Sequence, residues 1–187
     1  MLEEIDYSIN VIAKGGIILY PTDTVWGIGC DATNQSSIDR IYKLKRRAET
    51  KSMIILVNDI DMLKEYVSNI PETVLDLIEC FDQPTTIIYP EVNNIPKNLI
   101  DEDGGCAIRI VNDVFCKQLI TLFGKPIVST SANISGEPTP LLFCKISEKI
   151  TKSVDYVVKI GHDKINQLKP STIIKLRKNG EYDIIRQ

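Results

Sequence analysis

Two segments that lie far apart in the sequence each join a short apolar run to a stretch of hydroxyl, amide and glycine residues. The first run, Ile17 to Leu19, leads into residues 20–29 (YPTDTVWGIG), and the second, Ile127 and Val128, leads into residues 129–136 (STSANISG). Mixed α/β proteins commonly build small-molecule sites from such loops, because the sheet holds the loop still while its polar groups face a ligand. The sequence therefore predicts a binding pocket at the ends of strands.

Around these segments, short β-branched runs alternate with amphipathic stretches, a pattern typical of a sheet layered with helices. The expected strands cover residues 17–20, 53–57, 85–89, 106–110, 154–160, 171–176 and 182–186, with a hairpin across Asn179 and Gly180. The expected helices cover residues 5–13, a stretch through 38–44 that ends near 45–47, 62–67, 71–80 with Pro71 in the first helical position, and a stretch capped by Asn112 and ended by Gly124.

The length of 187 residues, without repeats or an obvious linker, is typical of one domain that can bury its own core. We therefore expect a single domain over residues 1–187 with an α/β fold, classed as α+β in some schemes. Its core is expected to be a twisted mixed β-sheet layered by helices, with a concave ligand cleft.

The composition excludes several classes of protein. A net charge of −3 and a pI near 5.3 argue against a protein that coats nucleic acid by bulk electrostatics, so a charged partner has to be bound locally. The five cysteines are odd in number and scattered, which suggests neither a disulfide framework nor a zinc site. The N-terminus lacks the layout of a signal peptide, and no apolar run approaches the ~20 residues that span a bilayer. We expect a soluble cytoplasmic protein without membrane contact.

A basic cluster, Lys43, Lys45, Arg46 and Arg47, follows at the end of the helix through residues 38–44, and Lys51 comes shortly after it. Cations at the C-terminal end of a helix are stabilised by its dipole by about 0.3–1 kcal/mol, which explains the cluster without any ligand. Arg47 and Lys51 also flank a turn that returns into a strand, so both could grip a polyphosphate from one side. Taken alone, the cluster leaves the two interpretations evenly balanced.

Arg109 lies in an apolar strand and needs an anionic partner, because burial of an unpaired charge is costly. That partner is either a carboxylate of the protein, in a structural salt bridge, or the carboxylate of a bound amino acid. The hydroxyl and amide residues Thr24, Ser131, Ser171 and Asn133, with Ser129 close by, commonly serve only to form turns. Their joint pattern favours binding.

Three familiar site types are disfavoured. Residues 27–32 (GIGCDA) formally match a dinucleotide fingerprint, but the glycines do not join a strand directly to a helix. No P-loop motif occurs. His162 is the only histidine and lies in a polar loop, where we expect it to be solvated, so a histidine-based triad or a multi-histidine metal site is hard to build.

The segments 21–27 (PTDTVWG), 45–47 (KRR) and 129–133 (STSAN) together resemble the YrdC-like family of threonylcarbamoyl-AMP synthases. The pattern of that family reads Pro-Thr-Asp/Glu-Thr-Val-aromatic-Gly, then Lys-x-Arg, then Ser-x-Asn, and the similarity runs from about Gly15 to the C-terminus. The resemblance implies a YrdC/RibB-like fold. It also implies a reaction that joins L-threonine, bicarbonate and ATP into threonylcarbamoyl-AMP and pyrophosphate, for the threonylcarbamoyladenosine modification of tRNA.

The resemblance also assigns individual residues. It places Thr24, Arg109, Ser131 and Ser171 at threonine, and it places Lys45, Arg47, Lys51, Asn133 and Arg186 at ATP, with Lys45, Arg47 and Lys51 as the catalytic cations. It implies Mg²⁺ held mainly by phosphates and water rather than by a protein metal site, with Asp23 as a possible outer contact. The chain departs from the family at Ala48, where many members have Pro, and at residues 81–86 (FDQPTT), where they have Trp-Pro-Gly-Pro-x-Thr.

Two other functions remain open from the sequence. One is carbamoyl transfer to a different acceptor, as in related domains of larger maturation enzymes. The other is an RNA-binding module that uses the basic patch from Lys43 to Lys51, although the net acidity and the lack of interleaved aromatic residues disfavour it. A contact with tRNA or with a tRNA-modifying enzyme is compatible with the synthase. The sequence leaves the oligomeric state undetermined.

Overall fold

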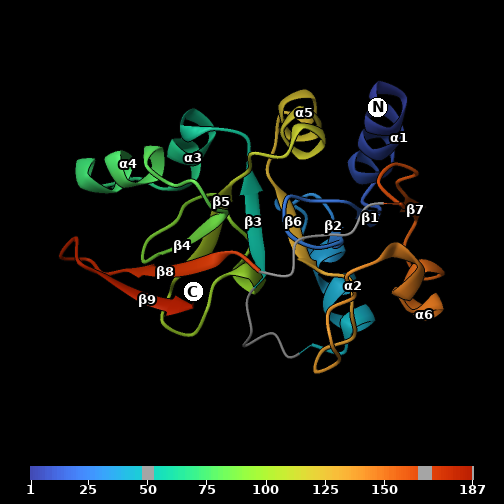
Figure 1. Cartoon of the computed structure of the whole chain (residues 1–187). Helices are drawn as coiled ribbons and strands as arrows, with labels where there is room; N and C mark the ends of the chain where they lie inside the picture. The colour runs from blue at the N-terminus through green and yellow to red at the C-terminus, as the bar shows by residue number, and fades with distance from the viewer. Residues whose placement is uncertain (48–52, 164–169, 187) are drawn as a thin grey trace.

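The computed structural model describes residues 1–47, 53–163 and 170–186, which form one mixed sheet with helices on both faces (Figure 1). The strands are β1 (Ile18–Tyr20), β2 (Gly27–Gly29), β3 (Ile54–Val57), β4 (Thr85–Tyr89), β5 (Cys106–Ile110), β6 (Ile127–Ser131), β7 (Tyr156–Val157), β8 (Thr172–Leu176) and β9 (Tyr182–Arg186). The α-helices are α1 (Leu2–Ala13), α2 (Gln35–Lys45), α3 (Ile60–Tyr66), α4 (Glu72–Glu79), α5 (Val114–Phe123) and α6 (Glu148–Thr151), with short 3-10 helices at Lys97–Leu99 and Phe143–Lys145.

The nine strands follow the order β7-β1-β2-β6-β3-β5-β4-β8-β9. The pairs β1/β7, β3/β5 and β4/β8 are parallel, and the other neighbouring pairs are antiparallel. The expected mixed α/β fold is therefore confirmed. Sequence-distant segments become neighbours in this order, because β6 lies between β2 and β3, and β8 joins the edge of β4.

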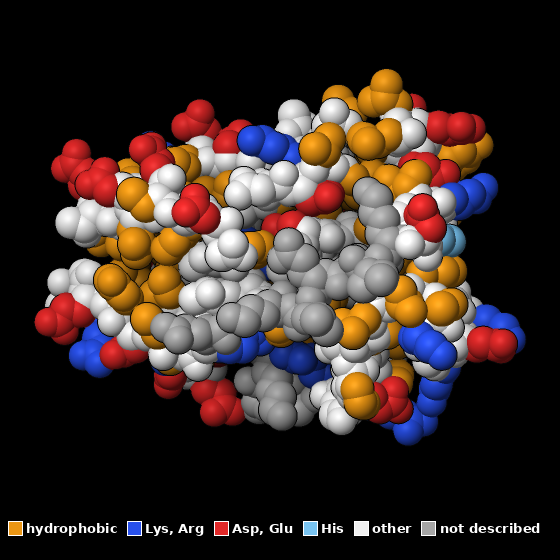
Figure 2. All heavy atoms as spheres, in the orientation of Figure 1, with side chains coloured by type: hydrophobic (Ala, Val, Ile, Leu, Met, Phe, Trp, Pro, Cys, Tyr) orange, Lys and Arg blue, Asp and Glu red, His pale blue; other side chains and the backbone are white. Residues whose placement is uncertain are grey.

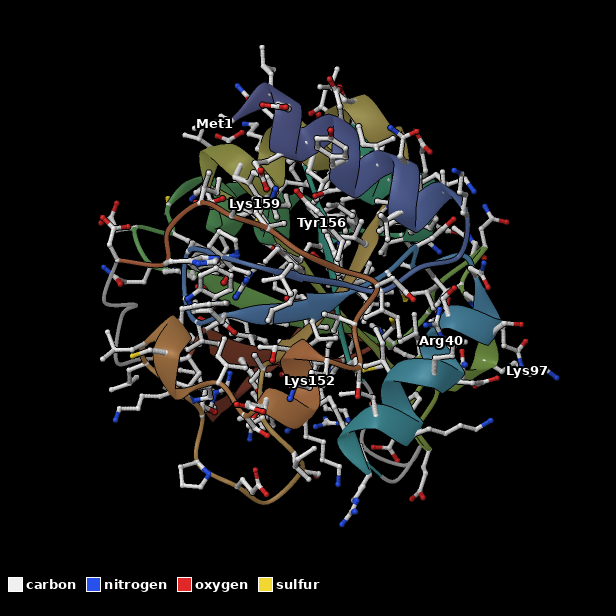
Figure 3. All side chains as sticks on the ribbon, turned by 90° about the vertical axis from the view of Figure 1, so that its right-hand side faces the viewer. Met1, Arg40, Lys97, Lys152, Tyr156 and Lys159 are labelled. Atoms are coloured by element: carbon white, nitrogen blue, oxygen red, sulfur yellow. The ribbon has the colours of Figure 1, made fainter. Side chains whose placement is uncertain are left out.

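Two apolar clusters lie on the two faces of the sheet, because successive side chains of a strand point to opposite faces. Ile18 and Tyr20 of β1 pack with α1 and α5, whereas Leu19 belongs to the cluster that contains residues of α2 and α3. Helix α1 is also held by polar contacts, since the Glu4 carboxylate accepts hydrogen bonds from the Tyr156 hydroxyl at 2.8 Å and from the Lys159 N–H at 2.7 Å (Figure 3).

Polar side chains fix the helix ends. The Asn34 side chain accepts a hydrogen bond from the Ser37 N–H at the start of α2. Helix α5 is capped by Asp113, whose carboxylate accepts from the Cys116 N–H at 2.8 Å, so the expected cap at Asn112 is wrong by one residue. Pro71 is the N-cap of α4 rather than its first helical residue, which also corrects the expectation.

Strands β4, β5 and β9 have the bounds expected from the sequence, and Gly180 adopts a φ of +87° in the turn of the expected β8–β9 hairpin. Strand β2 was not expected, because its three residues include two glycines. Strand β6 extends through Ser131, where a loop was expected, and the strand expected over residues 154–160 is confined to Tyr156–Val157. No helix in the described part of the chain has both the length and the apolar content to cross a bilayer.

Candidate functional site

A cavity of about 280 Å³ lies where the loop before β2, the strands β5 and β6 and the β8–β9 hairpin meet. Six of the nine residues that the resemblance assigned to the site line it: Thr24, Arg47, Arg109, Ser131, Ser171 and Arg186. Lys51 lies outside the described residues. Lys45 and Asn133 do not line the cavity, although both lie next to Ser131 in the structure.

The described lining of this cavity carries three arginines and no carboxylate. Burial lowers the pKa of Arg47, and burial together with the nearby charge of Arg109 lowers the pKa of Arg186. Both guanidiniums stay charged at neutral pH, because the ordinary pKa of arginine is above 12. Figure 2 shows Lys and Arg side chains near the middle of one face, between the β8–β9 hairpin and α2. Such a concentration of like charge favours an anionic ligand.

Arg109 comes from β5 and is 3% exposed. Its Nη2 donates to the Asp23 carboxylate at 2.9 Å, while its buried Nε has no hydrogen-bond partner among the described residues. Burial raises the pKa of Asp23, and Arg109 only partly opposes that rise. Arg109 therefore forms the structural salt bridge and also lines the cavity, and its buried Nε is left unsatisfied among the described residues. The Asp23 carboxylate, suggested as an outer contact for Mg²⁺, is occupied by Arg109.

A pair of threonine hydroxyls shapes the loop before β2. The Thr22 hydroxyl donates to the Val25 carbonyl at 2.7 Å and lies 3.1 Å from both the N–H and the hydroxyl of Thr24. Since the single hydroxyl proton of Thr22 is used by Val25, the Thr24 hydroxyl donates to Thr22 and keeps a lone pair for a ligand. Thr22 also lines the cavity, and we did not assign it from the sequence.

The β8–β9 hairpin brings Ser171 and Arg186 together. The Arg186 Nε and Nη2 donate to the Ser171 carbonyl at 3.0 and 2.8 Å, and the Ser171 hydroxyl lies 2.8 Å from the Thr86 hydroxyl. Thr86 of β4 is fully buried, and sequence reasoning missed it. Thr86 matches the final threonine of the family pattern Trp-Pro-Gly-Pro-x-Thr, and this match could have identified it.

Lys45 and Asn133 make contacts within the protein. The Lys45 ammonium binds the carbonyls of Ser131 and Asn133, the latter at 2.7 Å, and its side chain is 1% exposed. The Asn133 amide nitrogen donates to the carbonyls of Ile134 and Glu137, while its Oδ1 is buried without a partner among the described residues. Lys45, which the resemblance assigned to ATP, thus contacts two backbone carbonyls in this structure.

His162 is exposed, as expected, and its ring also makes aromatic contacts. It stacks on Phe143 with centroids 3.6 Å apart and meets Trp26 edge-on at 5.4 Å. The Nε2 of His162 lies 2.8 Å from the Val158 carbonyl. Trp26 belongs to the first polar segment, so this aromatic group packs that segment against the chain around Phe143.

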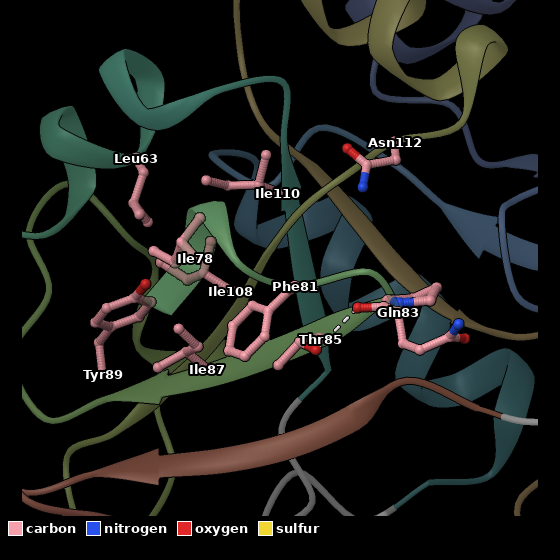
Figure 4. A pocket seen from close by; sticks show the side chains of 11 residues that line it. Leu63, Ile78, Phe81, Gln83, Thr85, Ile87, Tyr89, Ile108, Ile110 and Asn112 are labelled. Atoms are coloured by element: carbon pink, nitrogen blue, oxygen red, sulfur yellow. Dashed lines mark hydrogen bonds between the residues drawn. The ribbon is translucent and has the colours of Figure 1, made fainter. Parts of the chain in front are cut away.

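A second cavity of about 60 Å³, whose lining includes many apolar side chains, lies on the opposite face of β4 and β5, beneath α3 and α4 (Figure 4). Ile108 and Ile110 flank Arg109 in β5 and point into this cavity, as do Ile87 and Tyr89 of β4. Phe81 and Gln83, where the chain departs from the family pattern, line it as well. Four residues of the 81–86 segment, Phe81, Gln83, Pro84 and Thr85, therefore line this second cavity.

Among the described residues, no group of three or more His, Cys, Asp or Glu side chains could hold a metal ion. A cation bound in the arginine-lined cavity would have to bring most of its own ligands, and the phosphates of a nucleotide would supply such ligands.

Comparisons with known proteins show what the sequence and the fold of this chain resemble. A curated threonylcarbamoyl-AMP synthase from Pseudoalteromonas translucida is 35% identical over 154 residues, which cover 81% of this chain and 82% of that protein. The crystal structure of P. abyssi Sua5 with L-threonine superposes with a TM-score of 0.83 at 27% identity over 92% of this chain, and the chain spans about half (50%) of that longer protein. E. coli YciO, at 22% identity, has the same fold with a TM-score of 0.87, covering 100% of this chain and 90% of that one.

A family model described as "Telomere recombination", which represents the Sua5, YciO and YrdC proteins, matches residues 10–187. This match spans nearly the whole chain, including every residue that lines the arginine-rich cavity. The chain belongs to the Sua5/YciO/YrdC family.

Proposed function

We propose that the protein is an L-threonylcarbamoyladenylate synthase, which forms threonylcarbamoyl-AMP and pyrophosphate from L-threonine, bicarbonate and ATP. The observation that carries the proposal is the buried Nε of Arg109, an unpaired donor beside a cavity that two further arginines and several hydroxyls line. A buried guanidinium with a free donor is well made for a carboxylate. The curated relatives named threonylcarbamoyl-AMP synthase support the same conclusion.

The threonine end of the site consists of Arg109, Thr24, Ser131 and Ser171. Arg109 binds the carboxylate of threonine, and the Thr24 lone pair and the serine hydroxyls pair its amino and hydroxyl groups. A site of buried hydroxyls rejects an amino acid that lacks the hydroxyl, because its own polar groups are then left unpaired.

The nucleotide end consists of Arg47, Arg186, Lys45, Lys51 and Asn133. Arg47 and Arg186 line the cavity and bring positive charge to the polyphosphate, Lys45 and Asn133 lie next to the cavity wall at Ser131, and Lys51 is assigned to ATP by the resemblance. In the reaction, the amino group of threonine combines with bicarbonate, with loss of water, to give N-carboxythreonine. Its carboxylate then forms a bond to the α-phosphorus of ATP while the bond from that phosphorus to the bridging oxygen of the departing pyrophosphate breaks. That nucleophile is already ionised, so the protein contributes alignment and neutralises the charge of the departing pyrophosphate.

Mg²⁺ would accompany ATP, held by phosphate oxygens and water, where it offsets phosphate charge. The product supplies an activated carbamoyl group for the modification of adenosine in tRNA by another enzyme. This role is compatible with a cytoplasmic protein and with a contact to that enzyme or its tRNA.

The test is detection of threonylcarbamoyl-AMP by mass spectrometry after the protein is mixed with L-threonine, bicarbonate and ATP. Omission of any one substrate should abolish the product. Arg47→Ala should lower the rate at least tenfold, whereas Lys43→Ala, an exposed lysine on the same last helical turn, should leave it within about twofold. Turnover of ATP that does not depend on threonine would contradict the proposal and point to another acceptor.

A further inference from the structure

Lys45 is the last residue of α2, and its side chain is buried although it carries an ionisable group. Its ammonium contacts the Ser131 carbonyl and lies 2.7 Å from the Asn133 carbonyl. In the opposite direction, the N–H of Ser135 donates to the backbone carbonyl of Lys45 at 2.9 Å. Three hydrogen bonds therefore join the end of α2 to the last residue of β6 and to the segment that follows it.

Each side of this junction supplies part of the cavity wall. Arg47 comes two residues after Lys45, and Ser131 is itself one of the residues that Lys45 binds. Arg46, which lies between Lys45 and Arg47, adopts a φ of +52°, a left-handed conformation that turns the chain sharply at the end of the helix. Lys45 does not line the cavity, so it influences a ligand through the groups it holds.

The surroundings of Lys45 do not favour a permanent charge. The described residues give it two carbonyl oxygens and no carboxylate, and burial, reinforced by the charge of Arg47, lowers its pKa to about 7. The other ionisable groups nearby in the chain are Tyr42, Lys43 and Arg46 on its own helix end, and the segment packed against it adds the exposed Glu137. A change in the charges near Lys45 can therefore shift the protonation of its amine near neutral pH.

We propose that Lys45 is a positioning residue, which holds the Ser131 and Asn133 carbonyls by two hydrogen bonds that we call the clasp. A polyphosphate bound at Arg47 strengthens the clasp, because Lys45 then takes up a proton from solvent. The polyphosphate offsets the repulsion from Arg47, so the charged form of Lys45 becomes favourable. Hydrogen bonds from an ammonium are about twice as strong as those from a neutral amine. Binding of a ligand at the nucleotide end of the site thereby holds Ser131, at the threonine end, more firmly in position.

This inference rests on the proposed binding of a polyphosphate, and pyrophosphate alone is a sufficient probe. Calorimetric titration of pyrophosphate at pH 7.5, in two buffers that differ in ionisation enthalpy, measures the protons taken up on binding. The wild type should take up more protons on binding than Lys45→Met, because burial lowers the pKa of Lys45 to about 7 before pyrophosphate binds. Lys43→Met, the exposed neighbour, should match the wild type.

The kinetic test separates positioning from a merely structural role. Lys45→Met should raise the KM for threonine at least fivefold, and Lys45→Arg, which keeps both charge and donors, should restore it. Lys45→Arg should also take up no extra proton, since a guanidinium stays charged, and this variant decides the matter if Lys45→Met does not fold.

The outcomes distinguish this inference from the proposed function. Formation of threonylcarbamoyl-AMP by a protein whose proton uptake is the same in wild type and Lys45→Met would overturn the clasp and leave the synthase intact. Extra uptake by the wild type without formation of the adenylate would support the clasp while the proposed reaction fails. A wild type that does not bind pyrophosphate would overturn both.

Discussion

The ion pair between Arg109 and Asp23 allows a sharp test of the site. Arg109→Met keeps much of the volume of the side chain but leaves the Asp23 carboxylate, 13% exposed, without its cationic partner. Removal of one member of a buried ion pair commonly costs about 3–5 kcal/mol, because the remaining charge is left uncompensated. We expect the free energy of unfolding to fall by an amount in that range at pH 8.

The loss of stability in Arg109→Met should depend on pH, because the Asp23 carboxylate becomes neutral when it binds a proton. Burial already raises the pKa of Asp23, and Arg109 opposes that rise, so the pKa is higher still in Arg109→Met. In this variant the folded state binds more protons than the unfolded state between the two pKa values of Asp23. Its stability therefore falls with rising pH in that window, by up to about 1.4 kcal/mol per pH unit. The loss relative to wild type should be smaller at pH 5 than at pH 8.

Urea unfolding of wild type and variant at both pH values measures this difference. Arg177→Met is the matched control, since Arg177 is 54% exposed in its ion pair with Asp183, and its loss should cost less than about 1 kcal/mol at either pH. An Arg109→Met cost that is equal at pH 5 and pH 8, or no larger than that of Arg177→Met, would show that Asp23 is not the buried partner described.

Three further predictions follow from the packing and the hydrogen bonds. A Cβ added at Gly29 would lie 2.3 Å from the Val128 carbonyl oxygen, so Gly29→Ala should lower the free energy of unfolding by about 2 kcal/mol or more, and an unchanged urea midpoint would refute this. Thr86→Val, of the same shape, deprives the Ser171 hydroxyl of its buried partner and should cost about 1–3 kcal/mol and raise the KM for threonine; steady-state kinetics with unaltered KM would count against the contact. Burial lowers the pKa of Lys45 to about 7, so above pH 7 the unfolded lysine binds a proton that the folded one has lost. The free energy of unfolding of the wild type should therefore rise with pH relative to that of Lys45→Met, by up to about 1.4 kcal/mol per pH unit. Denaturation at pH 7 and pH 9 tests the sign.

Much of the fold could be predicted because strands and helices differ in hydrophobic period. Strands β4, β5 and β9 are β-branched runs bounded by turn residues, and their limits were predicted correctly. Strand β2 could not be found in this way, since its Gly27–Gly29 segment has no side-chain pattern and its pairing with β1 and β6 makes it a strand. The extension of β6 through Ser131 has the same cause.

For the site, the sequence motifs identified which residues gather but not how each is satisfied. Arg109 and Thr24 line the cavity as expected, whereas the pairing of Arg109 with Asp23 depends on a contact between residues 86 positions apart. The carbonyl partners of Lys45 are equally remote, at separations of 86 and 88 residues. No local pattern encodes such partners, because the tertiary arrangement of β5, β6 and the end of α2 creates them.

The alternation along β5 has a consequence for how reliably this protein folds. Ile108 and Ile110 fill the apolar side of the sheet under α3 and α4, while Arg109 between them faces the polar side. A slip of strand pairing by one residue would drive a permanent positive charge into hydrocarbon and expose two isoleucines to water, and both changes are strongly unfavourable. Arg109, which we assign to substrate recognition, thus also destabilises a sheet whose strands pair in the wrong register, and it thereby favours the correct register during folding.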